Sequence, residues 1–213
     1  MGLTLYFLRH GQTKYSLDNS FCGHLDAELL PEGHRMAAQF AEVYQSLPWQ
    51  RIISSPLKRT QATAKPICEA VGLDMQLEEE IKELDYGKWE GKTKETVNQE
   101  YHDDYVRWLT DPGWNAPTGG ERGVDLARRG MTVVRDLQEQ YTEGNVLIVS
   151  HKTMIRVLVC SLLGIDVGRF RDRIFMPVCC ITAVQFRSPG PLLLRMADQG
   201  HLEESLRSFP EVE

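Results

Sequence analysis

Several short groups of polar residues have the types and spacing that catalysis uses, and the first of them opens the chain. Arg9 and His10 directly follow the apolar run Leu5–Leu8, and Gly11 comes next. Ligands of open α/β sheets bind beyond the carboxyl ends of the strands, so a cation and an imidazole there are positioned for chemistry. Gly11 lets the backbone turn sharply or approach a ligand closely, because it has no Cβ. A strand end with a solvated arginine fits this stretch equally well when it is taken alone.

Two later apolar runs end in the same way. Ser54 and Ser55 close the second run, with Arg59 one helical turn further on, and Ser150-His151 closes the run Val146–Val149. If these strands are parallel and adjacent, two arginines and two imidazoles meet at one edge of the sheet. That collection matches a phosphoryl group, since arginine pairs two phosphate oxygens with its planar fork. The N-termini of the helices that follow are expected to add N–H donors.

The same residues suggest a reaction. An imidazole can be the nucleophile of a two-step displacement, and its lone pair is free at neutral pH because its reference pKa is about 6.5. Phosphoryl transfer also needs charge neutralisation and a proton for the leaving oxygen. A loop-like stretch further along the chain supplies three carboxylic acids: Glu83, Asp85 and Glu90. Spacing alone does not choose among them.

Strand-like and helix-like segments alternate along the chain. Three- and four-residue apolar spacing predicts helices, and short apolar runs predict strands. Helices are expected from Pro31 to Pro48, after a Ser54-Ser55-Pro56 cap, through Trp108, from Ala127 to Tyr141 and over 154–163; strands over 5–8, 51–54, 75–77, 146–149, 181–186 and 192–196. Residues 14–30 are expected to be loop, Pro66 to kink or end its helix, Thr118–Glu121 to cap a helix, and the tail beyond His201 to be loose. We predict a three-layer α/β/α fold with a mostly parallel central sheet.

Length and composition limit the alternatives. The 213 residues suffice for one large domain, 1–213, with 92–120 as a cap-like insertion. A net charge of −6 argues against nonspecific nucleic-acid binding. No apolar run is long enough to span a bilayer and no signal peptide is evident. The five irregularly spaced cysteines fit neither a disulfide framework nor a metal knuckle, so a reducing, cytoplasmic location is expected.

Four motifs in order along the chain resemble those of the histidine phosphatase superfamily, the phosphoglycerate mutase-like clan. They are Leu8-Arg9-His10-Gly11-Gln12-Thr13, Ser54-Ser55-Pro56-Leu57-Lys58-Arg59-Thr60, Glu83-Leu84-Asp85-Tyr86-Gly87-Lys88-Trp89-Glu90-Gly91 and Val149-Ser150-His151. Together they span almost the whole chain, which is far more specific than any one of them.

The resemblance implies a role for each catalytic residue. His10 would take the phosphoryl group, while Arg9, Arg59 and His151 would line the phosphate pocket. Glu83 would protonate the leaving alkoxide and then deprotonate the water that hydrolyses phosphohistidine. The resemblance implies no metal and no organic cofactor. It implies a small phosphorylated substrate and leaves homodimerisation open.

The chain departs from the family at the first loop. Relatives often carry a Trp-Asn pair where this chain has Tyr15-Ser16, and an Arg-x-Gln-Gly run where it has residues 20–23. Lys152 replaces the usual small residue after the second histidine, which predicts a substrate with a second anionic group. The candidate substrate-binding residues are Gln12, Thr13, Ser16, Cys22, Gly23 and Lys152.

The activity has competing interpretations. The short chain and the Tyr86–Gly91 motif resemble broad-specificity and alpha-ribazole phosphatases, so a phosphomonoester hydrolase acting through phosphohistidine is favoured. Phosphoglycerate mutase-type transfer and a noncatalytic phosphometabolite-binding protein are the alternatives. A metallohydrolase is disfavoured because no HExxH or comparable ligand cluster occurs. The histidines His24, His34, His102 and His201 have no supporting motif and are interpreted as surface or packing residues.

Overall fold

A six-stranded sheet with the strand order β3-β2-β4-β1-β5-β6 forms the centre of the computed structural model, which describes residues 2–207. Its strands are β1 (Leu3–Arg9), β2 (Trp49–Ser54), β3 (Met75–Leu77), β4 (Gly144–Ser150), β5 (Ile181–Arg187) and β6 (Gly190–Asp198). The pairs β2–β3, β2–β4 and β1–β4 are parallel, whereas β5 and β6 continue the sheet antiparallel. The prediction of an α/β fold with a mostly parallel sheet is confirmed.

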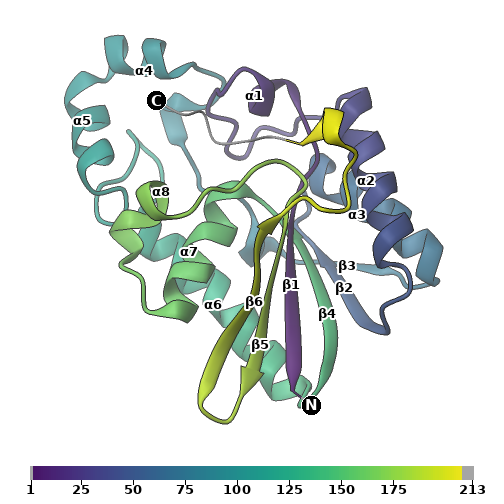
Figure 1. Ribbon diagram of the computed structural model, residues 1–213. Coiled ribbons are helices and arrows are strands. Elements are labelled where there is room, and N and C mark those ends of the chain that lie inside the picture. Colours follow the sequence, from purple (N-terminus) through teal and green to yellow (C-terminus); the bar gives the residue numbers. More distant parts are fainter. Residues whose placement is uncertain (1, 208–213) are drawn as a thin grey trace.

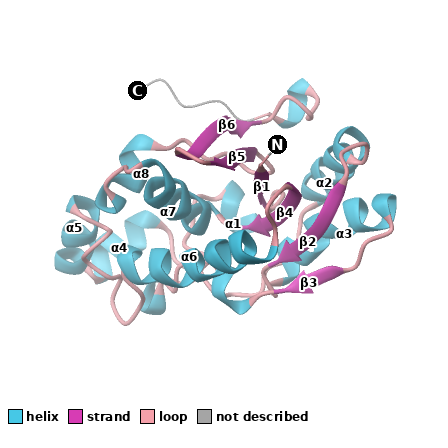
Figure 2. Cartoon of the chain, turned by 90° about the horizontal axis from the view of Figure 1, so that it is seen from below, coloured by secondary structure: helices cyan, strands magenta, loops and turns pink. Residues whose placement is uncertain are grey.

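Helices cover both faces of this sheet (Figures 1 and 2). One face carries α2 (Pro31–Tyr44) and α3 (Lys58–Val71), and the other carries α6 (Gly123–Gln140) and α7 (Lys152–Leu163). Side chains alternate along β4, as the pleat requires. Leu147 and Val149 join the core cluster that contains the buried residues of α2 and α3, whereas Val146 and Ile148 join the cluster of α6 and α7. Three layers are the result.

The predicted insertion forms two short helices beside the carboxyl ends of the parallel strands (Figure 1). These are α4 (Lys94–Glu100) and α5 (His102–Thr110). Tyr105 and Trp108 of α5 are buried against Trp89, with ring centroids 5.7 and 5.5 Å away. The aromatic side chains of this segment are therefore mostly packing residues, although Trp114 is 63% exposed.

Short elements complete the described chain. They are α1 (Lys14–Leu17), α8 (Phe170–Arg173) and the 3-10 turns η1 (Glu79–Ile81), η2 (Gly87–Trp89), η3 (Val167–Arg169) and η4 (Glu204–Leu206). Within residues 2–207, no helix has the length and hydrophobicity that crossing a membrane requires.

Several local predictions were wrong. The serines do not cap α3, which begins at Lys58 after Leu57 without a side-chain cap. Pro66 does not end α3, which continues to Val71, and the buried Ile67 and Cys68 that follow it stabilise the helix against the lost hydrogen bond.

Three further segments differ from expectation. Residues 14–30 contain α1, which Thr13 caps. The segment 118–121 does not cap α6, because its N-cap is Arg122 without a side-chain bond. The tail is anchored as far as Leu206, whose side chain is buried, and 208–213 lie outside the described residues.

Candidate active site

The carboxyl ends of β2, β4 and β1 lie side by side and bring the predicted residues together. Arg9 is opposite Ser150 in the β1–β4 register, and Ser54 is opposite Val149 in the β2–β4 register. The next residues along β1 and β4 are the two histidines, His10 and His151, whose ring centroids are 5.4 Å apart. The predicted convergence of the three strand ends is therefore present.

His10 is held with one ring nitrogen free. Its Nδ1 lies 2.8 Å from the carbonyl oxygen of Gly11. Because that oxygen can only accept, Nδ1 carries the hydrogen and Nε2 keeps its lone pair. Burial lowers the pKa of His10 well below its usual value, and the charges of Arg59 and Arg9 lower it further. The imidazole is neutral at pH 7, as a nucleophile must be.

Gly11 allows this arrangement because another helix passes directly against it. A Cβ at Gly11 would lie 2.6 Å from the carbonyl oxygen of Gly33 in α2. The Gly11 N–H also donates to Oγ1 of Thr63 in α3 at 3.0 Å. Contacts with two helices thus fix the backbone that orients His10.

His151 is oriented by Arg59 and Ser55. The Nε–H of Arg59 donates to His151 Nδ1 at 3.2 Å, so the hydrogen of this ring is on Nε2, which lies 2.8 Å from Ser55 Oγ. Burial lowers the pKa of His151 well below its usual value, followed by the charge of Arg59. Like His10, this imidazole is neutral at pH 7.

The two arginines are buried, at 8% exposure for Arg9 and 1% for Arg59. Arg59 also donates to the carbonyl oxygens of Leu25 and Gly23, both at 2.8 Å. Arg9 donates through Nη1 to the Met176 carbonyl at 2.6 Å, and its buried Nε has no partner within residues 2–207. A buried N–H without an acceptor is costly, so this edge of Arg9 is suited to an anionic ligand.

Glu83 lies against the N-terminus of α7, the helix that begins directly after His151. Its carboxylate accepts the backbone N–H groups of Leu84, Thr153 and Met154 at 2.8, 3.1 and 3.2 Å. The helix dipole favours a negative charge at that position. A buried carboxyl group is thereby fixed at the start of the helix that follows His151.

The hydrogen-bond partners of the three candidate acids distinguish Glu83 from Asp85 and Glu90. Asp85 accepts the N–H of Gly87 at 2.7 Å within its own turn. Glu90 accepts the N–H groups of His24 and Tyr86 at 2.7 and 3.4 Å. Neither carboxylate shares the α7 N-terminus that Glu83 occupies.

His24 contacts the backbone of Glu83, and the sequence did not predict this contact. Its Nε2 lies 2.8 Å from the carbonyl oxygen of Glu83, which Arg129 also contacts through Nη2 at 2.9 Å. Both side chains therefore support the backbone that carries Glu83. Nothing near His24 in the sequence reveals this contact, because Glu83 is 59 positions away.

Polar atoms of the predicted first-loop ligands bond largely within the loop. Thr13 and Ser16 form a reciprocal capping box at the start of α1. Cys22 points its Sγ at the Leu25 carbonyl, 3.6 Å away, and burial raises the pKa of its thiol to about 11. Gln12 is half-buried at the same edge of the sheet.

Gly23 takes a conformation that favours glycine, with φ +51°. A Cβ there would lie 1.9 Å from Glu90 Oε1. Its carbonyl oxygen is one of the acceptors that hold Arg59, so Gly23 connects the first loop to the centre of the site.

Lys152 begins α7 directly after His151 and is half-buried. Burial lowers the pKa of its ammonium group to about 7, and the charges of Arg9 and Arg156 act in the same direction. Its side chain is thus in the electrostatic field of Arg9, and its role in substrate binding stays a prediction.

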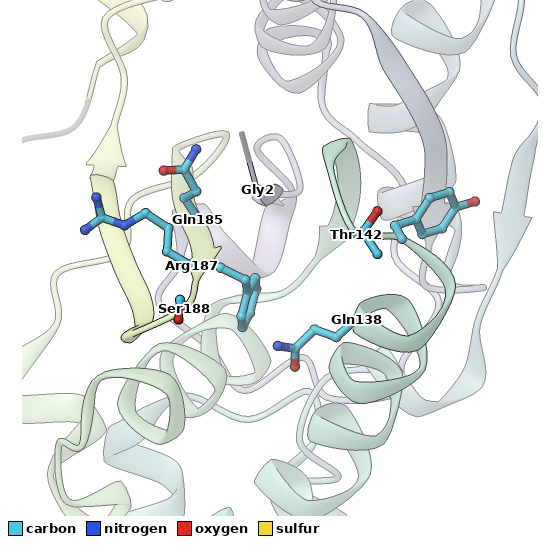
Figure 3. Close-up of a pocket in the computed structure, with 8 residues that line it drawn as sticks. Gly2, Gln138, Thr142, Gln185, Arg187 and Ser188 are labelled. Carbon is cyan, nitrogen blue, oxygen red and sulfur yellow. The ribbon is translucent and has the colours of Figure 1, made fainter.

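A separate pocket of about 550 Å³ lies at the opposite end of the sheet (Figure 3). Gln138 and Thr142 line it from the end of α6 and the segment that follows, and Arg187 and Ser188 line it from the β5–β6 turn. Its position at the start of β1, marked by Gly2, places it away from the two histidines.

Comparison with known proteins identifies the class to which this fold and site belong. Residues 5–199 match the histidine phosphatase superfamily (branch 1), and the chain is a member of that family.

Individual relatives agree with this assignment. The chain is 32% identical over 166 residues to phosphoserine phosphatase 1 of Hydrogenobacter thermophilus, covering 78% of this chain and 79% of that protein. It is 33% identical over 173 residues to glucosyl-3-phosphoglycerate phosphatase of Mycolicibacterium vanbaalenii, covering 78% and 76%. The structure of a mycobacterial glucosyl-3-phosphoglycerate phosphatase complexed with VO3 superposes with a TM-score of 0.83 at 30% identity, covering 91% of this chain and 98% of that one.

Proposed function

We propose that this protein hydrolyses phosphate monoesters of small metabolites through a phosphohistidine intermediate. The observation that carries the proposal is the fixed tautomer of His10, whose free Nε2 lies among Arg9, Arg59 and His151. Membership of the histidine phosphatase superfamily and the phosphatase relatives support the same reaction.

Each step follows from the chemistry of these groups. The lone pair of His10 Nε2 attacks phosphorus, and the bond from phosphorus to the ester oxygen breaks. Glu83 in its protonated form gives its proton to the leaving alkoxide. The ionised Glu83 then takes a proton from water, whose oxygen attacks phosphohistidine and releases inorganic phosphate and free His10. Arg9 and Arg59 bind the phosphoryl oxygens throughout, and His151 lines the pocket and orients Arg59.

The decisive experiment is hydrolysis of 4-nitrophenyl phosphate in the presence of EDTA by wild type and His10→Ala. We expect activity that survives EDTA and is lost in the variant. His34→Ala is the control, because His34 is an exposed histidine of α2 and its loss leaves the nucleophile intact. Full activity of His10→Ala would show that another group attacks phosphorus.

The products distinguish phosphatase from mutase action. A phosphatase releases inorganic phosphate from 3-phosphoglycerate, whereas a mutase returns an isomeric phosphoglycerate. The two named relatives act on phosphoserine and glucosyl-3-phosphoglycerate, which are phosphate monoesters that also carry a carboxylate. This substrate class is therefore the first to screen.

We infer a cytoplasmic location from the cysteines. All five are free thiols, and Cys68, Cys160, Cys179 and Cys180 are buried. Free thiols are typical of reducing compartments. Fractionation of the native host cells, followed by immunodetection, tests this location.

A further inference from the structure

Three cationic side chains near the site form no ion pair within residues 2–207, although the charge of Glu83 acts on the first two and that of Asp172 on the third. Lys152 and Arg156 are on α7 and Arg171 is on α8; we call them the cation cluster. Within the described chain, the side chains of Lys152 and Arg156 form no ion pair or hydrogen bond, and the Nε of Arg156 is buried without a partner. By contrast, Arg122, Arg129 and Arg195 each pair with an acid.

The cation cluster adjoins the phosphate-binding end of the site. Lys152 directly follows His151, and Arg156 lies one turn later on the same face of α7. The positive charge of Arg9 acts on both Lys152 and Arg156, and the charge of Arg171 acts on Arg156. The cluster therefore extends from Arg9 toward α8.

Arg171 is held in position by an aromatic ring of the insertion. Its Cζ lies 4.2 Å from the centroid of the Trp108 ring, a favourable cation–π geometry. Trp108 is itself buried in the aromatic cluster of α5. The guanidinium is thus fixed against the insertion, close enough to the α7 cations for its charge to act on Arg156.

Mutual repulsion and burial make this arrangement unfavourable in the free protein. Burial and, next, the charge of Arg9 lower the pKa of Arg156 to about 10, while burial also lowers the pKa of Arg171. A bound anion would remove that strain, because each cation would gain an opposite charge. Arg9 and Arg59 already provide for the phosphoryl group, so the additional cations indicate a second anionic group on the substrate.

We propose that Lys152, Arg156 and Arg171 form a subsite for a carboxylate of the substrate. The enzyme then selects phosphate monoesters of hydroxy acids or amino acids whose carboxylate lies a few bonds from the ester oxygen. A carboxylate fits because arginine binds it in a bidentate fork and because the cluster begins immediately beside the phosphate arginines. This assignment rests on the proposed phosphatase function and specifies which substrates that function serves.

The test compares 3-phosphoglycerate with glycerol 3-phosphate, which differ by a carboxylate against a hydroxymethyl group. The measured quantity is the ratio of kcat/KM for the two substrates, in wild type and Arg156→Gln. A lost charge-assisted hydrogen bond lowers this ratio about 10- to 100-fold, mainly because the substrate with the carboxylate then binds more weakly and its KM rises. Arg156→Lys, which keeps the charge, restores part of the ratio.

Arg173→Gln is the matched control, since Arg173 is an exposed arginine of the same short helix as Arg171. It removes one positive charge near the site without touching the cluster, so the ratio stays at its wild-type value. If Arg156→Gln does not fold, Lys152→Gln answers the same question. A wild-type ratio near one, or an unchanged ratio in both cluster variants, overturns the subsite.

A binding measurement separates this inference from the proposed function. Calorimetry on His10→Ala gives the Kd for each compound without turnover. Tighter binding of 3-phosphoglycerate that depends on Arg156 supports the subsite. This holds even if the wild type hydrolyses nothing, whereas that absence of hydrolysis would overturn the proposed phosphatase activity. Hydrolysis of 4-nitrophenyl phosphate that requires His10, together with equal Kd values for the two metabolites, overturns the subsite and leaves the phosphatase intact.

Discussion

Acid should destabilise this protein through His201, a buried histidine that the proposed reaction does not use. Its ring packs edge-on against Phe40 and Tyr44, with centroids 5.3 and 5.7 Å away, and it is 9% exposed. Burial lowers the pKa of His201 to about 4. In the unfolded chain the pKa of a histidine is about 6.5.

The sign and size of the effect follow from this difference. Below pH 6.5 the unfolded chain binds a proton on His201 that the folded protein does not bind, so the free energy of unfolding falls as the pH falls. At pH 4.5 the loss is about 2.5 kcal/mol, which is nearly two pKa units at about 1.4 kcal/mol each. The pKa values of His10 and His151 are lowered too, and they add to the loss in the same direction.

Urea denaturation of wild type and His201→Phe at pH 7.5 and pH 4.5 measures this contribution. Carboxylates titrate in both proteins and cancel in the comparison. We expect the free energy of unfolding to fall by about 2.5 kcal/mol more in wild type than in the variant over this range. Equal losses in the two proteins would refute the claim that His201 is buried uncharged.

Two further predictions concern the site. Glu83→Gln should lower the hydrolysis of glycerol 3-phosphate about 10²- to 10⁴-fold, while release of 4-nitrophenolate in the first turnover stays nearly unchanged because that leaving group needs no proton; equal losses in rapid-mixing assays would contradict the role of Glu83 as acid. Lys152, whose pKa is about 7, loses its charge as the pH rises, so the preference for 3-phosphoglycerate over glycerol 3-phosphate should fall about 5- to 10-fold between pH 6.5 and 8.5. In Lys152→Arg the preference should stay flat over this range, and a parallel fall in both proteins would assign the titration to another group.

The sequence predicted the centre of the site because the relevant signal is local. An apolar run that ends in Arg9-His10, or in Ser150-His151, marks a buried strand and the polar residues at its carboxyl end. Parallel pairing of β1 with β4 then brings these ends together. The choice of Glu83 among three acids needed the family motif, and the structure shows the contact with α7 that distinguishes it.

What the sequence did not predict depends on contacts between distant segments. His24 supports a carbonyl group that only the fold places nearby. The environment of Arg156 arises from Arg9 on β1 and Arg171 on α8, so its place on α7 alone predicts an ordinary helix residue. The start of α3 was placed too early because Ser55 looked like a cap, whereas its hydroxyl contacts His151.

The helix N-termini at the site act differently from the sequence expectation that they bind phosphate. The N–H groups of Thr153 and Met154 in α7 donate to the Glu83 carboxylate, and the Lys58 N–H at the start of α3 donates to Asp26 Oδ1 at 2.7 Å. The buried arginine side chains are therefore the main source of positive charge for the phosphoryl group. The dipole of α7 instead favours the Glu83 carboxylate at the start of that helix, so a helix terminus positions the acid while buried guanidinium groups bind the anion. This division explains why Arg9 and Arg59 are buried despite the desolvation that burial of a charge entails.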